Sequence, residues 1–168
     1  MSNNTQTTND LPQKIGTLFI EIVKIVLLAG ITVFLVRHFI FKPFYVKGKS
    51  MEPNFSAHDY LIVDQLTYQF RPPKRGEVVV FHPPVGDKEY YLKRVIGMPG
   101  ERVRIKQGKV IVCELDCNVL KENYIDGTDL EEMGSYSVTL GKEQYFVLGD
   151  NRDNSSDSRI FGPIDRDA

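Results

Sequence analysis

The stretch that decides the fold is Tyr90-Tyr91-Leu92-Lys93-Arg94-Val95-Ile96-Gly97-Met98-Pro99-Gly100. It is a largely aromatic and aliphatic run that ends in a proline–glycine turn signal, as a β-strand does. Working outward, we expect this strand at 90–97 and others at 44–46, 60–64, 77–82, 102–106, 110–113 and 144–148. No long helical period separates these strands, so the sequence predicts an all-β or mostly β domain.

Composition narrows the class of protein. The chain has 168 residues and a net charge of −1, enough for one modest domain plus an anchor, and nothing global indicates nucleic acid as a partner. Only two cysteines occur, Cys113 and Cys117, with three residues between them, which excludes a Cys-x-x-Cys redox motif and a four-ligand zinc site. A hairpin disulfide and two free thiols both remain open.

The N-terminal region combines a polar tail and an apolar run. Residues 1–16 are polar and are expected to be a disordered cytoplasmic tail. Residues 18–40 are apolar and, as a helix, would span roughly 34 Å against a bilayer core of roughly 30 Å. Charged residues interrupt only its ends, and no A-x-A cleavage pattern follows it. We therefore expect an uncleaved membrane helix within 17–41 that Pro43 ends, although the uncharged core, 25–36, is short enough for a buried helix or a signal-peptide core.

The charges around this helix disagree with an outward-facing domain. Lys14 is the only basic residue before the run, whereas Arg37, Lys42, Lys47 and Lys49 follow it. Cytoplasmic flanks are usually the more basic, so this bias predicts that the C-terminal domain is cytoplasmic.

Three familiar motifs are excluded. Gly48-Lys49-Ser50 resembles the end of a phosphate-binding loop, but the required glycine is replaced by Pro43. The segment 150–154 fails both registers of an EF-hand calcium loop, which leaves an Asx-rich surface turn. The histidines, His38, His58 and His82, lie in the anchor end or beside turns and make no Ser-His-Asp triad.

Lys93 is a candidate general base. A lysine buried in apolar surroundings has a lowered pKa and can be neutral at working pH. Strand alternation places Lys93 on one face with Tyr91 and Val95. The alternative is an edge-strand lysine whose ammonium reaches solvent.

Four segments, in this order along the chain, resemble the sequence boxes of type I signal peptidases. They cover most of residues 43–164. The segments are Gly48-Lys49-Ser50-Met51-Glu52-Pro53, Pro73-Lys74-Arg75-Gly76-Glu77-Val78-Val79-Val80-Phe81, Tyr91-Leu92-Lys93-Arg94-Val95-Ile96-Gly97-Met98-Pro99-Gly100-Glu101 and Gly149-Asp150-Asn151-Arg152-Asp153-Asn154-Ser155-Ser156-Asp157-Ser158-Arg159.

The resemblance implies a serine–lysine protease without cofactor or metal. Ser50 would be the nucleophile, Lys93 its general base, and the Ser155 hydroxyl would orient the lysine amine. The backbone N–H of Ser50 would be the first oxyanion donor. Some family members have a serine where this chain has Gly48, so the second donor stays open.

Further residues take supporting roles in the same resemblance. A pairing of Asp157 with Arg94 and Arg159 would hold the last box against the lysine strand. By position, Phe44, Val46 and Leu92 would line shallow pockets for small substrate side chains at −1 and −3.

The family also implies an architecture and a location. We expect an antiparallel β-sheet or barrel catalytic domain, at 42–168, with one N-terminal transmembrane helix. It would lie on the outer face of a bacterial cytoplasmic membrane, where exported preproteins emerge, with membrane lipid and the secretion machinery as further partners. Family members usually continue with another strand beyond Ala168, which predicts a truncated chain.

Two rival hypotheses remain. Another serine–lysine protease, such as a self-cleaving repressor, would need a DNA-binding domain where the polar tail and apolar helix stand. A membrane-tethered β-domain without catalysis would leave Ser50 unreactive toward acylating inhibitors.

Overall fold

A computed structural model describes residues 10–39, 41–64, 66–85, 89–125 and 135–168. The chain divides into two compact units, each of which is described by itself. The first comprises Met1–Lys42 with Asp64–Leu66, and the second comprises Pro43–Val63 with Thr67–Ala168.

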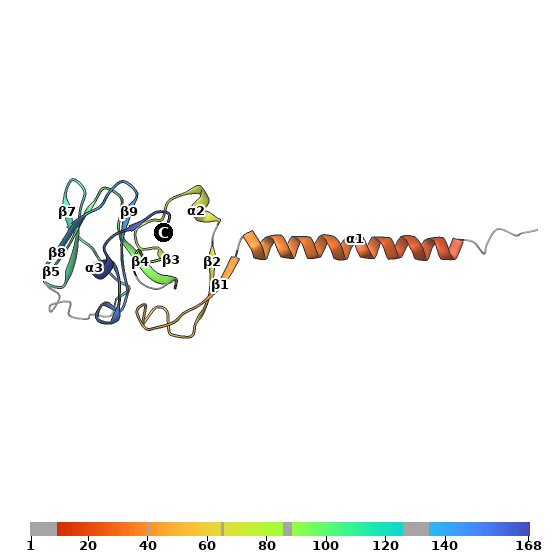
Figure 1. Cartoon of the computed structure of the whole chain (residues 1–168), viewed down its shortest axis with the longest axis horizontal. Helices are drawn as coiled ribbons and strands as arrows, with labels where there is room; N and C mark the ends of the chain where they lie inside the picture. The colour runs from red at the N-terminus through yellow and green to blue at the C-terminus, as the bar shows by residue number, and fades with distance from the viewer. Residues whose placement is uncertain (1–9, 40, 65, 86–88, 126–134) are drawn as a thin grey trace, which may run out of the picture. The chain divides into compact units, whose positions relative to one another are not determined.

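Helix α1 (Asp10–Phe39) dominates the first unit (Figure 1). Its segment Lys14–Arg37 is the one described helix that is long and apolar enough to cross a membrane, and its side chains are exposed. The expected disordered tail is wrong for residues 10–16, which are helical, whereas residues 1–9 lie outside the described part. Pro12 falls in the first turn, where its missing N–H leaves no helical hydrogen bond unmade.

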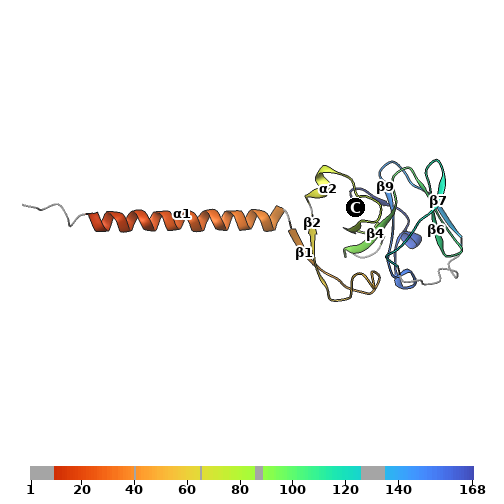
Figure 2. The ribbon, with the colours of Figure 1, turned by 180° about the vertical axis from the view of Figure 1, so that it is seen from behind.

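The second unit is built from short antiparallel strands in three sheets (Figures 1 and 2). A two-stranded sheet, most of whose residues belong to this unit, pairs β1 (Phe41–Tyr45) with β2 (Tyr60–Asp64). One four-stranded sheet has the order β10-β9-β4-β3, formed by Ile164–Asp165, Gln144–Leu148, Tyr91–Gly97 and Val78–Phe81. The other has the order β7-β6-β5-β8, formed by Cys117–Val119, Lys109–Cys113, Arg102–Lys106 and Tyr136–Thr139.

Three short helices complete the described elements. They are α2 (Thr67–Phe70), the 3₁₀ helix η2 (Arg152–Asn154) and α3 (Ser158–Phe161). The mostly β prediction and all seven expected strands are confirmed, with small shifts of their ends. The expectation that Pro43 ends the N-terminal helix is wrong. Helix α1 already ends at Phe39, and Pro43 lies inside β1. The sequence missed β7, β8, β10 and the short helices.

Strand β4 is the central element, because both of its faces are buried. Val95 on one face packs with the cluster Val79, Phe81, Tyr145, Val147 and Ile164. Ile96 on the other packs with Val103, Ile105, Val110, Val112, Leu140, Phe146 and Leu148. At Gly97 the sheets approach so closely that a Cβ would collide with the Val103 side chain. Packing on both faces of β4 therefore desolvates a polar side chain that lies on this strand.

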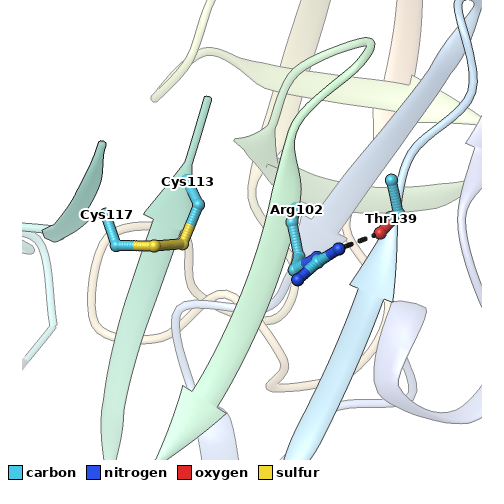
Figure 3. Close-up of a disulfide and its surroundings, with 4 residues drawn as sticks. All are labelled: Arg102, Cys113, Cys117 and Thr139. Atoms are coloured by element: carbon cyan, nitrogen blue, oxygen red, sulfur yellow. Dashed lines mark hydrogen bonds between the residues drawn. A yellow bond between two sulfur atoms is a disulfide. The ribbon is translucent and has the colours of Figure 1, made fainter. Parts of the chain in front are cut away.

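The two cysteines form a disulfide across the β6–β7 hairpin, where Cys113 and Cys117 are register partners (Figure 3). This resolves the alternative that the sequence left open. On the neighbouring strands, the Arg102 Nε donates a hydrogen bond to Thr139 Oγ1 at 3.2 Å (Figure 3). Neither cysteine lines the cavity described below.

Candidate active site

Ser50 and Lys93 meet although they stand 43 positions apart in the sequence. Ser50 lies in the loop that leaves β1, and Lys93 lies in β4. Lys93 Nζ donates to Ser50 Oγ at 2.7 Å and to the carbonyl oxygen of Leu92 at 3.0 Å. This is hydrogen-bond distance for proton transfer between a nucleophile and its base.

The loop that carries Ser50 is fixed on both sides. Upstream, Val46 N–H donates to the Asp59 carbonyl at 2.9 Å, and Val46 accepts from His58 N–H at 3.0 Å. Downstream, the Met51 side chain is buried, and the Ser50 carbonyl accepts from Asn151 N–H at 3.0 Å. The serine hydroxyl is therefore presented from a backbone tied to two separate segments.

Burial sets the acid–base character of Lys93. The residue is only 4% exposed, and loss of water lowers its pKa from 10.5 to about 8. Asp157 opposes this shift, while the positive charge of Arg159 adds to it. The alternative of an edge-strand lysine in solvent is wrong, since β4 lies between β3 and β9. A substantial fraction of this amine is neutral slightly above neutral pH.

The ion pairs beside the lysine strand differ from the expected set. Asp157 pairs with Arg159 Nε at 2.7 Å, as predicted, and it also accepts from Gly149 N–H at 3.1 Å. In the described part of the chain, Arg94 pairs instead with Asp150. Its Nε and NH2 donate to the two oxygens of that carboxylate at 2.8 Å and 2.6 Å. The predicted Arg94–Asp157 pair is therefore wrong: the acid that pairs with Arg94 is Asp150, the first of the last box.

The Ser155 hydroxyl is buried close to the pair. Its Oγ has no hydrogen-bond partner among the described residues, so the expected bond to the Lys93 amine is not made in this structure. A Cβ on Gly149 would clash with both Ser155 Oγ and the Ser50 carbonyl oxygen. Ser155 Oγ and the Ser50 carbonyl oxygen therefore both pack against the side of Gly149 on which any other residue would carry its Cβ.

A cavity of about 520 Å³ opens beside Ser50 and Lys93. The three residues predicted to line substrate pockets, Phe44, Val46 and Leu92, all line it. Its walls come from the β1 end and from residues 89–93 at the start of β4, so it lies between two extended segments. Such a groove fits an extended peptide.

The described residues form no metal-binding cluster, and none of their histidine side chains lines the cavity. No group of three or more His, Cys, Asp or Glu side chains is arranged to hold a metal ion there. His58 and His82 are exposed and contact Tyr45 and Tyr90, and neither lines the cavity. The His38 side chain lies outside the described part.

Sequence reasoning missed a buried network next to the site. Asp150 and Arg152 are each 2% exposed, so the segment 150–154 does not begin as the surface turn that composition favoured. Arg152 pairs with Glu122, and Asn54 donates to Asp150 at 2.9 Å. Glu122 and Asn54 carry no motif or periodicity that marks them.

Comparison with known proteins shows the family to which the chain belongs. The family model described as "Signal peptidase, peptidase S26" matches residues 19–168. The chain is 38% identical over 154 residues to a Synechocystis protein named "Probable signal peptidase I-2", covering 89% of this chain and 68% of that protein. It is 40% identical over 147 residues to "Signal peptidase I P" of Bacillus subtilis subsp. natto, covering 83% and 78%.

A solved structure is also similar. The crystal structure of a signal peptidase I from Enterococcus faecalis V583 matches 57% of this chain and 92% of that one, with 27% sequence identity and a TM-score of 0.48. The likeness at this score is loose, and the family assignment rests on the sequence matches.

Proposed function

Because the chain belongs to the peptidase S26 family and is a type I signal peptidase, a serine endopeptidase, we propose that it cleaves exported preproteins with Ser50 as nucleophile and Lys93 as general base. The observation that carries this proposal is the 2.7 Å contact between Lys93 Nζ and Ser50 Oγ, made by a lysine that is almost fully buried.

The chemistry runs in two halves. Neutral Lys93 accepts the Ser50 hydroxyl proton while Oγ attacks the carbonyl carbon of the −1 residue. The C–N bond then breaks, the leaving amine takes the proton from the Lys93 ammonium, and an ester to Ser50 remains. Water, deprotonated by Lys93, attacks this ester; the proton returns to Ser50 Oγ as the signal peptide leaves as a carboxylic acid.

The oxyanion needs donors aimed at the position where negative charge develops. The Ser50 backbone N–H is the first, because it belongs to the attacking residue. Gly48 offers no hydroxyl, so the second donor is a backbone N–H or a water molecule. Because the first oxyanion donor is the Ser50 backbone N–H, catalysis depends on the path of the Ser50 backbone as well as on its side chain.

Specificity follows from the groove. A substrate strand lying between the β1 end and residues 89–93 would alternate its side chains, so that −1 and −3 face the same wall and −2 faces away. Phe44, Val46 and Leu92 line the cavity, and we expect them to leave room for small side chains only. Backbone pairing tolerates varied sequences, while the two pockets limit size.

We place the catalytic unit on the outer face of the bacterial cytoplasmic membrane, with α1 as a single span. Exported preproteins emerge on that face, and a cytoplasmic copy would not meet them. The basic residues that follow the span, including Lys47 and Lys49, would then lie against anionic lipid head groups, which attract basic segments.

Cleavage of a detergent-solubilised preprotein that carries an A-x-A site tests the proposal. The wild type should cut after the −1 alanine, whereas Ser50→Ala and Lys93→Ala should stay folded and inactive. Ser137→Ala, an exposed serine on β8, is the matched control and should keep full activity. Retained cleavage by Lys93→Ala would remove the proposed base, and absence of cleavage by all variants would favour a binding module.

A further inference from the structure

We propose that Glu122 is a positioning residue for this reaction, which holds the Ser50 backbone through Arg152 and the turn Gly149–Asn151. The inference rests on the proposed function and extends it to a segment outside the four sequence boxes. Glu122 does not touch the reacting atoms. It acts by fixing the turn on which the nucleophile's carbonyl rests.

The first link joins Glu122 to Arg152. Their side chains are only 7% and 1% exposed, and both terminal nitrogens of the guanidinium contact the carboxylate, NH1 to Oε2 at 3.1 Å and NH2 to Oε1. A bidentate pair of this kind fixes orientation as well as charge. The remaining guanidinium nitrogen, Nε, donates to the Gly149 carbonyl at 2.9 Å. The carboxylate of Glu122 thereby sets where the Gly149 carbonyl lies.

The second link joins this turn to the nucleophile. Asn151 N–H donates to the Ser50 carbonyl at 3.0 Å. Gly149 approaches the same carbonyl so closely that a Cβ there would collide with it. A displacement of the turn therefore moves the Ser50 backbone, and with it both Oγ and the N–H proposed as oxyanion donor.

Tyr124 reinforces the arrangement from the same segment. Its hydroxyl donates to Glu122 Oε1 at 2.8 Å, and the Arg94 guanidinium lies 4.2 Å from its ring centre. Asn54, four residues after the nucleophile, donates to the Tyr124 carbonyl at 2.6 Å. Burial, together with the Glu122 charge, raises the pKa of Tyr124, so the phenol remains a donor. Residues 122–124 thus contact the turn, the lysine strand and the nucleophile loop.

Loss of the Glu122 charge should act on kcat. Arg152 would keep a buried charge without its carboxylate and would shift toward other acceptors, taking the Gly149 carbonyl with it. A displacement of about 1 Å at a reacting group can cost on the order of 100-fold in rate. Phe44, Val46 and Leu92 are not part of this network, so substrate binding should change little.

The test compares two buried carboxylates in the full-length, detergent-solubilised enzyme. Glu122→Gln removes the charge beside the site, and Glu101→Gln removes the carboxylate that pairs with Arg75, a pair outside this network with the carboxylate 8% exposed. We expect kcat for the A-x-A preprotein to fall roughly 10- to 100-fold in Glu122→Gln, with KM within about twofold of wild type. Glu101→Gln should lose comparable thermal stability and keep its kcat.

A milder variant covers the case in which Glu122→Gln does not fold. Tyr124→Phe deletes one hydrogen bond to Glu122 without leaving a buried charge, and it should lower kcat by about two- to tenfold at unchanged KM. The apparent pKa of kcat/KM should stay at the wild-type value in both, because Lys93 is untouched. Equal kcat in Glu122→Gln and Glu101→Gln, or wild-type kcat in Tyr124→Phe, would overturn the inference. The proposed function is tested separately from this inference: the wild type should cleave the preprotein and Ser50→Ala should not, whatever the kcat of Glu122→Gln.

Discussion

Lys93 Nζ lies 2.7 Å from Ser50 Oγ, on a strand whose two faces both belong to hydrophobic clusters. The ammonium form is therefore held where it is least favourable, and the contact to a hydroxyl replaces only part of its lost hydration. The same burial that costs the fold free energy leaves the amine able to accept a proton. Burial of the Lys93 side chain thus links the packing of the fold to the proposed chemistry.

The first prediction concerns the pH dependence of cleavage. Only neutral Lys93 can take the Ser50 proton, and burial lowers its pKa to about 8. We expect kcat/KM to rise about tenfold per pH unit below that value and to level off above it. Steady-state rates between about pH 6 and 10 on one preprotein measure this. A profile that is flat through this range would contradict a lysine base.

The second prediction concerns stability. A lowered pKa means that the folded state binds the Lys93 proton more weakly than the unfolded chain, so the charge destabilises the fold below about pH 8, and the cost fades as pH rises toward 10.5. Lys93→Met should therefore be inactive yet more stable near neutral pH, by up to about 3 kcal/mol.

Urea unfolding at neutral pH and again near the upper end of that range measures this effect. The gain of Lys93→Met over wild type should shrink at the higher pH. Lys106→Met, at an exposed lysine on β5, is the control and should show no pH-dependent gain. A constant gain at both pH values would mean that packing of the methionine, not removal of a buried charge, explains the result.

The strands that the sequence predicted well are short runs of aliphatic and aromatic residues, alternating with charged residues only in 102–106. Residues 60–64, 102–106 and 144–148 have the same bounds in the structure. The missed strands β7, β8 and β10 have four residues or fewer, and every residue of β7 is exposed, so each is too short to show a clear hydrophobic pattern. Pairing with a neighbour, not local preference, makes them strands.

The residues of the candidate site also divide into those that the sequence could indicate and those that it could not. Ser50 and Lys93 could be singled out because their boxes are distinctive, and the structure brings them together. The partner of Arg94 was predicted wrongly, because Asp150 and Asp157 stand in one box and only the path of the turn decides which of them pairs with Arg94. Glu122 could not be found at all, since its role depends on a contact with a residue 30 positions away.

The third prediction separates those two acids. Arg94 and Asp150 are 12% and 0% exposed at their side chains, and breaking such a pair leaves an uncompensated charge. Asp150→Asn should cost about 3 to 5 kcal/mol of unfolding free energy. A double-mutant cycle with Arg94→Met should give a coupling of about 0.5 to 3 kcal/mol, whereas the cycle of Arg94→Met with Asp157→Asn should give much less. The reverse order would restore the pairing that the sequence suggested.

The last prediction concerns Ser155. Its Oγ is buried without a hydrogen-bond partner among the described residues, beside the glycine that also touches Ser50. A buried hydroxyl left unsatisfied costs about 1 to 3 kcal/mol, so a partner that appears during the reaction is favoured, and the Lys93 amine is the group we propose. Ser155→Ala should lower kcat by roughly 10- to 100-fold, less than Ser50→Ala or Lys93→Ala, while the unfolding midpoint stays level or rises. Single-turnover cleavage with Ser137→Ala as control measures this. Wild-type kcat in Ser155→Ala would show that the orphaned hydroxyl is a packing feature, and would leave orientation of the amine to the Leu92 carbonyl, which already accepts from it at 3.0 Å.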